Sequence, residues 1–156
     1  MKRHASTKSH PIAHITVEDA ACRSKIADAL RAQGWTVIEH PTGLHLIHAI
    51  SGLILGDEPW RRPGLIVADA AARGCSGVSI ARGLRDLGSR IPVIVVARAA
   101  DELVAMREGP LTIVKPEDAQ RTVELFARSR RHRRPIQRHT TQLFEARKSF
   151  AEAKEQ

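Results

Sequence analysis

Four charged residues of this sequence follow short apolar segments directly, which is where catalytic groups gather in parallel sheets. They are Glu18, Asp19, Asp69 and Lys115. Crowded carboxylates repel one another, so their pKa values rise unless nearby cations neutralise the carboxylate charges. Lys115 supplies one positive charge, and Mg²⁺, which prefers oxygen ligands, would supply more. An aspartate beside such an ion can accept a phosphoryl group as an aspartyl phosphate, with metal and lysine neutralising the phosphoryl oxygens.

The segment 64–69 positions the central carboxylate of this set. It is apolar at nearly every position up to Asp69 and is bounded by Pro63 and Gly74, which is typical of a buried parallel strand. Ligands of open α/β sheets bind beyond the carboxyl ends of the strands, so Asp69 is expected at that edge. For Asp69 alone, an aspartate that ends a strand and caps the next turn is the alternative interpretation.

Similar apolar segments alternate with helical patterns along the chain. Strands are predicted at 12–17, 35–39, 64–69, 91–96 and 111–114. Helices are predicted at 19–34, 44–55, 78–87 and 117–131, with a short one at 101–108 and a tail helix at 141–154. The residues expected to face inward from the second and third helices include Leu44, His48 and Leu87. This alternation predicts right-handed βαβ units and a parallel sheet covered on both faces.

Charge divides the chain into a neutral domain and two basic ends. Residues 11–127 carry thirteen Lys and Arg against fourteen Asp and Glu, whereas residues 1–10 add three positive charges and residues 128–156 add six. We therefore expect a flexible basic tail over residues 1–11, one domain over residues 12–128 and a basic extension over residues 129–156.

The sequence excludes several functional classes. No apolar segment follows the basic start, so no secretory signal is expected, and the longest apolar runs are too short to span a bilayer. No dinucleotide-binding or Walker motif occurs. The absence of tyrosine and the scarcity of other aromatic residues argue against a base-stacking RNA platform. A cytoplasmic protein with reduced thiols and no membrane contact is the simplest account.

Two weaker candidate sites remain open. Cys22 and Cys75 have no C-x-x-C spacing, and both are expected near the carboxyl edge of the sheet, where they could form a redox pair. His45 and His48 lie about one turn apart on a predicted helix and could bind a metal, although no third ligand is evident.

The ordered set of segments resembles the CheY-like receiver domain of bacterial two-component response regulators over about residues 12–128. The segments that carry the resemblance are Ile15-Thr16-Val17-Glu18-Asp19, Gly34 to Glu39 with Thr42-Gly43, Leu65 to Asp69, Gly77, Pro92 to Val96, and Lys115-Pro116, whose proline is usually cis in the family. The resemblance implies a flavodoxin-like, doubly wound α/β fold with a five-stranded parallel sheet in the order 2-1-3-4-5.

The resemblance also implies roles for individual residues. Asp69 would be the phosphoacceptor, and Lys115 would bind the phosphoryl oxygens. Mg²⁺ would be held by Glu18, Asp19, Asp69 and the backbone carbonyl of Ala71. The protein would be a signalling phosphoacceptor rather than an enzyme, with any autophosphatase activity incidental. Its partners would be a histidine kinase or phosphotransfer protein and a downstream protein, and receiver domains of this kind often form homodimers.

The sequence departs from the family pattern where the signal is normally read. The fourth strand ends in Ala97 rather than Ser or Thr, the aromatic switch position is Thr112, and Arg73 stands where Pro is common. Two hypotheses follow. The first is a single-domain response regulator that takes phosphate onto Asp69 with Mg²⁺. The second is a degenerate receiver that acts without phosphorylation, as an interaction module through its basic tail.

The basic run Arg128–Arg134 is the strongest local charge feature. A solvated helix end is the simpler interpretation. The alternative is an electrostatic contact with nucleic acid or an acidic protein. One short helix after Pro135 cannot form a helix-turn-helix, so a sequence-specific transcription factor is not expected.

Overall fold

The computed structural model describes residues 10–56, 61–98 and 111–132. The strands are β1 (Ile12–Thr16), β2 (Thr36–Glu39), β3 (Leu65–Asp69), β4 (Val93–Val96) and β5 (Leu111–Val114). The helices are α1 (Ala20–Ala32), α2 (Gly43–Leu55), α3 (Gly77–Asp86) and α5 (Pro116–His132). Strand and helix types agree with the sequence predictions for every one of these elements. The predicted helices at 101–108 and 141–154 lie outside the described residues.

The five strands form one parallel sheet in the order β2-β1-β3-β4-β5, which confirms the predicted fold class. The register aligns the ends of the strands. Asp69 pairs with Val96, Val96 pairs with Val114, and Ala68 pairs with Thr16. The residues that follow β1, β3, β4 and β5 therefore emerge at one edge of the sheet.

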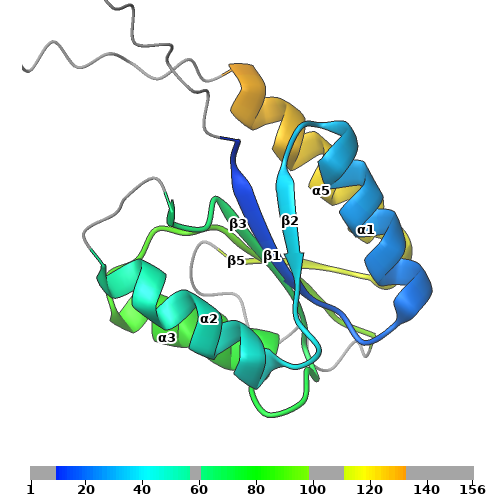
Figure 1. Cartoon of the computed structure of the whole chain (residues 1–156). Coiled ribbons are helices and arrows are strands. Elements are labelled where there is room, and N and C mark those ends of the chain that lie inside the picture. Colours follow the sequence, from blue (N-terminus) through cyan, green and yellow to red (C-terminus); the bar gives the residue numbers. More distant parts are fainter. Residues whose placement is uncertain (1–9, 57–60, 99–110, 133–156) are drawn as a thin grey trace, which may run out of the picture.

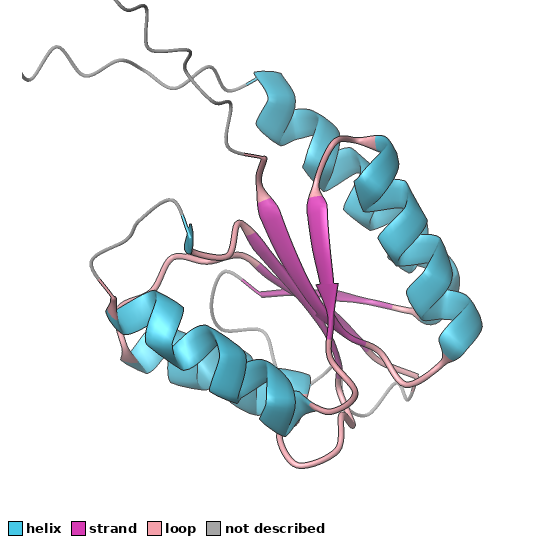
Figure 2. Cartoon of the chain, in the orientation of Figure 1, coloured by secondary structure: helices cyan, strands magenta, loops and turns pink. Residues whose placement is uncertain are grey.

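Helices cover both faces of the sheet, with α1 and α5 on one side and α2 and α3 on the other (Figures 1 and 2). Every residue of β3 and β4 is buried, as expected for central strands covered on both faces. One core cluster lies beneath α1 and α5 and includes Ile15, Ile26, Leu30, Val67 and Val123. The other lies beneath α2 and α3 and includes Leu46, Ile50, Ile66, Ile80 and Val95.

Local capping explains where the helices begin. The side chains of Asp19, Thr42 and Ser76 accept hydrogen bonds from backbone N–H groups three residues later, at the starts of α1, α2 and α3. Helix α5 begins instead at Pro116, whose missing N–H costs nothing in the first turn. The peptide bond before Pro116 is trans, so the expectation of a cis proline is wrong.

Three of the residues predicted to face inward are exposed. Leu44 is 60% exposed and Leu87 is 62% exposed, and His48 is also exposed. Leu87 is the C-cap of α3, beyond its last helical residue, and so does not continue the buried stripe formed by Ile80 and Leu84. None of the described helices is long and apolar enough to cross a membrane.

The start of α3 packs very closely against the end of β3. A Cβ atom on Gly77 would lie 2.8 Å from the backbone carbonyl oxygen of Asp69 and 3.1 Å from the Cβ of Ala68. Both contacts are with atoms of a buried strand, which cannot easily move. Glycine is therefore required at position 77, next to the candidate site.

We expect Gly77→Ala to destabilise the protein by about 1–3 kcal/mol, because the added methyl group overpacks a rigid contact. Gly83→Ala is the matched control, since it lies in the same helix and a Cβ there meets nothing within 4 Å. Its helix propensity should increase stability by about 0.5–1 kcal/mol. Urea unfolding of the two variants measures both effects, and equal midpoints would contradict the close-approach argument.

A pair of histidines is buried beneath α2. Nδ1 of His14 lies 2.9 Å from Nε2 of His40, the two rings are stacked, and Nε2 of His14 is buried with no hydrogen-bond partner. Burial, together with the neighbouring His40, lowers the pKa of His14 to about 4. Burial and His45 likewise lower the pKa of His40. His14 is therefore neutral in the folded protein at neutral pH.

Because the unfolded chain protonates His14 near its ordinary pKa of 6.5, the unfolded state takes up more protons between about pH 6.5 and pH 4. We expect stability to be complete above pH 6.5 and to fall as the pH drops towards 4, by at most about 3 kcal/mol from this residue. His14→Leu should flatten this part of the pH profile, whereas His48→Gln, at an exposed position, should not. An unchanged slope in His14→Leu would contradict the assignment.

Candidate functional site

The three acidic residues singled out from the sequence meet at the carboxyl edge of the sheet. Glu18 and Asp19 follow β1, and Asp69 ends the neighbouring strand β3. The backbone N–H of Glu18 donates a hydrogen bond of 2.6 Å to Oδ2 of Asp69. The parallel pairing of β1 with β3 therefore fixes the position of Asp69 relative to the acidic pair.

Asp69 is the buried member of the set, with only 6% of its surface exposed. Burial raises the pKa of its carboxyl group, and the nearby charges of Glu18 and Asp19 raise it further. The hydrogen bond from Glu18 and the positive charge of Arg98 act in the opposite direction, and burial outweighs both. The surroundings of Asp69 therefore destabilise the charged form of its carboxyl group.

Asp19 serves two partners with its two carboxylate oxygens. Oδ1 accepts the capping hydrogen bond from the N–H of Cys22, at 2.7 Å. Oδ2 lies 3.6 Å from Nη2 of Arg98, which comes two residues after β4. Asp19 therefore has a capping role of the kind that the sequence left open for Asp69. This does not exclude a second role, because among the described residues Oδ2 is engaged only by the exposed Arg98.

Arg73, in the loop after β3, forms an ion pair with Glu18. Its Nε lies 3.4 Å from Oε1 of Glu18, and both side chains are substantially exposed. The sequence marked Arg73 only as a departure from a pattern, and it identified neither Arg73 nor Arg98 as a partner of the acids. The available signal was their position, since each follows a strand whose carboxyl end lies at this edge. Exposed ion pairs of this length contribute at most about 1 kcal/mol and exchange readily.

The remaining predicted site residues lie at or near the same edge. Lys115 directly follows β5, and its exposed side chain forms no ion pair with the three acids among the described residues. The exposed Ala71 lies in the turn after Asp69, where the N–H of Ala72 bonds back to the carbonyl oxygen of Asp69 at 3.2 Å. The register places all these positions together, whereas a contact of Lys115 or Ala71 with Asp69 stays a prediction.

The donor chemistry of this edge fits a hard divalent cation, because every predicted ligand is an oxygen. The crowding of Glu18 and Asp19 around the desolvated carboxylate of Asp69 also favours a cation there. In the described part of the chain, however, no three His, Cys, Asp or Glu side chains converge as a ready metal site. Arg73 and Arg98 hold Glu18 and Asp19, so a cation would bind in competition with these two arginines.

The two altered switch positions differ in their surroundings. Ala97 is buried, and its N–H bonds to the carbonyl oxygen of Val114 at 2.9 Å, which joins the ends of β4 and β5. Thr112 is exposed on the edge strand β5. Neither position carries a hydroxyl group placed near Asp69 by the described contacts.

The weaker candidate sites are not supported. Cys22 packs with the core beneath α1 and α5, whereas Cys75 packs with the core beneath α2 and α3, so the two free thiols lie on opposite faces of the sheet. Burial raises the pKa of both thiols. His45 bonds through Nδ1 to Oγ1 of Thr42 at 2.7 Å, and His48 is exposed, with no metal-binding group among the described residues. Most of the basic run Arg128–Arg134 continues α5 to His132, and its last two residues lie outside the described ranges.

We expect Asp69→Asn to stabilise the protein at neutral pH. The substitution keeps an oxygen for the N–H of Glu18 but removes a charge that burial disfavours. The gain should disappear at acidic pH, below the pKa of Asp69 in both folded and unfolded states, because the native carboxyl group is then also neutral. Asp86→Asn, at an exposed position, is the control and should change stability by less than about 0.5 kcal/mol. Thermal unfolding at several pH values measures both, and a loss of stability in Asp69→Asn would contradict this electrostatic account.

Comparisons with known proteins agree with the architecture. No family model and no curated protein sequence matches the chain. Solved structures do match. The phosphorylated cyanobacterial phytochrome response regulator RcpA is 17% identical with a TM-score of 0.56, and 75% of this chain covers 91% of it. A response regulator receiver domain protein from Clostridium thermocellum is 16% identical with a TM-score of 0.57, and 78% of this chain covers 96% of it.

A third match is the Mn²⁺-bound form of the response regulator Rcp1, which is 18% identical with a TM-score of 0.54, and 74% of this chain covers 91% of it. The similarity to these proteins extends over about three quarters of this chain, which forms a five-stranded parallel sheet. The chain therefore has the fold of a response regulator receiver domain.

Proposed function

We propose that this chain is a receiver in two-component signal transduction and that Asp69 accepts a phosphoryl group from the phosphohistidine of a partner kinase or phosphotransfer protein. The observation that carries the proposal is the placement of Asp69. It ends the central strand at the carboxyl edge, it is desolvated, and it is flanked by Glu18 and Asp19. Likeness of fold to receiver domains, one of them a phosphorylated response regulator, supports the proposal.

The described contacts suit Asp69 for nucleophilic attack. Its carboxylate makes one hydrogen bond among the described residues, at Oδ2, so Oδ1 is available to form the new bond to phosphorus. The bond from phosphorus to the histidine nitrogen breaks as the new one forms, and the histidine leaves with its electron pair and takes up a proton. Partial desolvation raises the energy of the carboxylate before transfer. The carboxyl oxygen that becomes bonded to phosphorus no longer carries this charge, so transfer relieves the unfavourable burial.

The other residues of the edge would serve the phosphoryl oxygens and the cation. Lys115 would neutralise charge on the phosphoryl oxygens, and Glu18, Asp19, Asp69 and the carbonyl of Ala71 would hold Mg²⁺. When bound, the cation would supply charge neutralisation for the transferring group. Arg98 adds a positive charge that lowers the pKa of Asp69, and it stands next to Ala97, the position that lacks the usual hydroxyl.

A second candidate function is supported by the ion pairs at the same edge. Arg73 and Arg98 already neutralise Glu18 and Asp19, so the acidic edge is balanced without a metal ion. Together with the absent hydroxyl at Ala97, this arrangement suits a receiver fold that binds partners without phosphorylation. Its basic run Arg128–Arg134 would then contact an acidic protein or nucleic acid.

Intact-protein mass spectrometry after incubation with acetyl phosphate distinguishes these functions. We expect a single phosphoryl adduct on the natural chain in the presence of Mg²⁺, and its loss when a chelator removes the cation. Asp69→Asn should carry no adduct. Asp86→Asn is the matched control and should be modified like the natural chain, because that exposed carboxylate lies on α3, away from the acidic edge.

An adduct that persists in Asp69→Asn would overturn the assignment of the acceptor. If no adduct forms with acetyl phosphate or with a phosphorylated kinase, and calorimetry detects no Mg²⁺ binding, the second candidate function is favoured. Arg98→Gln adds a discriminating arm. It removes one competitor of the cation, so we expect Mg²⁺ affinity to increase if the acidic edge is the metal site.

A further inference from the structure

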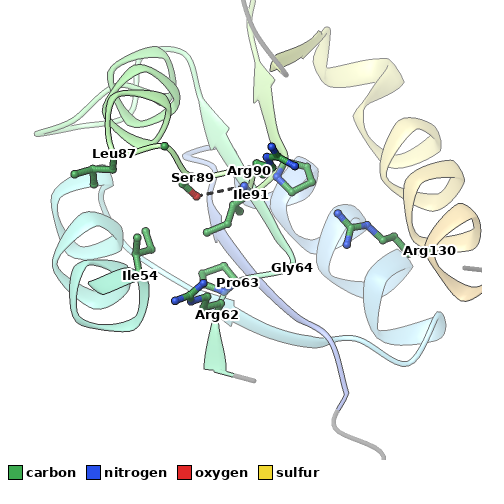
Figure 3. A pocket seen from close by; sticks show the side chains of 11 residues that line it. Ile54, Arg62, Pro63, Gly64, Leu87, Ser89, Arg90, Ile91 and Arg130 are labelled. Atoms are coloured by element: carbon green, nitrogen blue, oxygen red, sulfur yellow. Dashed lines mark hydrogen bonds between the residues drawn. The ribbon is translucent and has the colours of Figure 1, made fainter. Parts of the chain in front are cut away.

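A separate cavity lies at the amino edge of the sheet, at the opposite ends of the strands from Asp69. It has a volume of about 550 Å³ and opens between the segments that precede β3 and β4 and the ends of α2, α3 and α5 (Figure 3). The residues that line it are Ile54, Arg62, Pro63, Gly64, Leu87, Gly88, Ser89, Arg90, Ile91, Pro92 and Arg130. The proposed phosphoacceptor chemistry does not account for this cavity, and of the basic run Arg128–Arg134 only Arg130 is among its lining residues.

The lining is positively charged and contains no acidic residue. It includes Arg62, Arg90 and Arg130, which come from three separate parts of the chain. Figure 3 shows their side chains around the opening, with Arg130 reaching across from α5. None of the three forms an ion pair within the described part of the chain. The guanidinium of Arg130 lies 5.4 Å from the ring centroid of Phe126, which orients it without neutralising its charge.

Helix dipoles offset only part of this charge. The carboxyl ends of α2, α3 and α5 point towards this edge, and each contributes a partial charge of about −0.5. Three guanidinium groups carry a full positive charge each, which exceeds the partial charges of the three helix ends. Asp86, the last residue of α3, directly precedes Leu87 but is not among the lining residues.

The rest of the lining is apolar and locally fixed. Leu87, Ile54 and Ile91 supply the large apolar side chains of the lining, and Leu87 is 62% exposed. The loop that carries Ser89 is held by hydrogen bonds. The N–H of Ser89 donates to the carbonyl oxygen of Leu84 at 2.9 Å, and Oγ of Ser89 accepts from the N–H of Ile91 at 3.3 Å. The cavity therefore exists before any ligand binds.

We propose that this cavity binds a phosphorylated organic molecule of nucleotide size. Guanidinium groups pair with phosphate oxygens through two parallel hydrogen bonds, and three arginines can serve a polyphosphate chain. The apolar wall formed by Leu87, Ile54 and Ile91 would take the planar body of the ligand. A volume of about 550 Å³ lies within the usual range for small-molecule sites. This site is independent of Asp69.

The test is a titration of the full-length chain with ATP, pyrophosphate and adenosine, in buffer without divalent cations. Calorimetry gives the affinities, and amide chemical shifts locate the site. We expect ATP to bind more tightly than pyrophosphate, adenosine alone to bind weakly or not at all, and the amides from Gly88 to Ile91 to shift. Arg90→Gln and Arg130→Gln should each weaken ATP binding about tenfold, the loss expected for one charge-assisted contact.

Matched variants separate the cavity from general attraction to a basic protein. Arg121→Gln removes the same charge from α5 at an exposed position outside the cavity, and Arg133→Gln with Arg134→Gln removes charge from the basic run. All of these should retain ATP affinity within about twofold. Ser89→Asp keeps an acceptor for the N–H of Ile91 but adds a negative charge to the cavity, so it should abolish binding while the thermal midpoint stays near that of the natural chain.

Several outcomes would overturn the proposal. They are no detectable ATP binding, equal losses in the cavity and control variants, and shifts confined to amides near Asp69. Equal affinity for ATP and pyrophosphate would show that the apolar wall contributes nothing and would remove the organic part of the inference. An acidic peptide that displaces ATP and binds more tightly would show that the cavity takes a protein segment instead.

Discussion

The hydrogen bond from the backbone of Glu18 to the carboxylate of Asp69 joins the two strands on which the acidic edge depends. It is a charge-assisted bond to a carboxylate that is almost excluded from water. The bond needs β1 and β3 in parallel register, and that register needs both faces of the sheet to be covered by helices. The packing of four helices on one sheet is thus what allows a charged group to persist at this position.

Arginine side chains partly neutralise the negative charge at this edge of the sheet. Two arginines from successive loops pair with the exposed acids, while the buried acid receives a backbone N–H. Each ion pair is exposed and weak, so the balance can shift towards another cation without disturbing the core. In such a site the buried Asp69 is fixed, whereas Glu18 and Asp19 can exchange their arginine partners for another cation. This arrangement suits reversible phosphorylation, and it equally suits a receiver fold that is no longer phosphorylated.

The fold could be predicted almost completely from the sequence, because the signals for it are local and repeated. Apolar strands, capping residues and glycine turns each specify their own segment, and a parallel α/β chain has few ways to assemble them. The position of Asp69 and of the acidic pair followed from the rule that strand ends share an edge. Two of the three side chains wrongly predicted to face inward, Leu87 and Leu44, lie at helix ends, where the periodic pattern continues but the packing does not; the third, His48, is exposed within α2.

The roles of Arg73 and Arg98 could not be predicted, because ion pairing depends on distances between side chains of different loops. The cavity at the amino edge could not be predicted for the same reason, since its three arginines are far apart in the sequence. The histidine pair could not be predicted either, because His14 is in β1 and His40 directly follows β2, and only the pairing of these two strands brings the rings together.

The two ends of the described chain, His10 before β1 and His132 at the end of α5, both lie at the amino edge of the sheet (Figure 1). Residues 1–10 and 128–156, which together carry nine excess positive charges, therefore join the described domain at the end of the sheet opposite Asp69. A negatively charged partner held close to these two points of attachment would approach the domain from its amino edge and would leave the edge with Asp69 open to solvent.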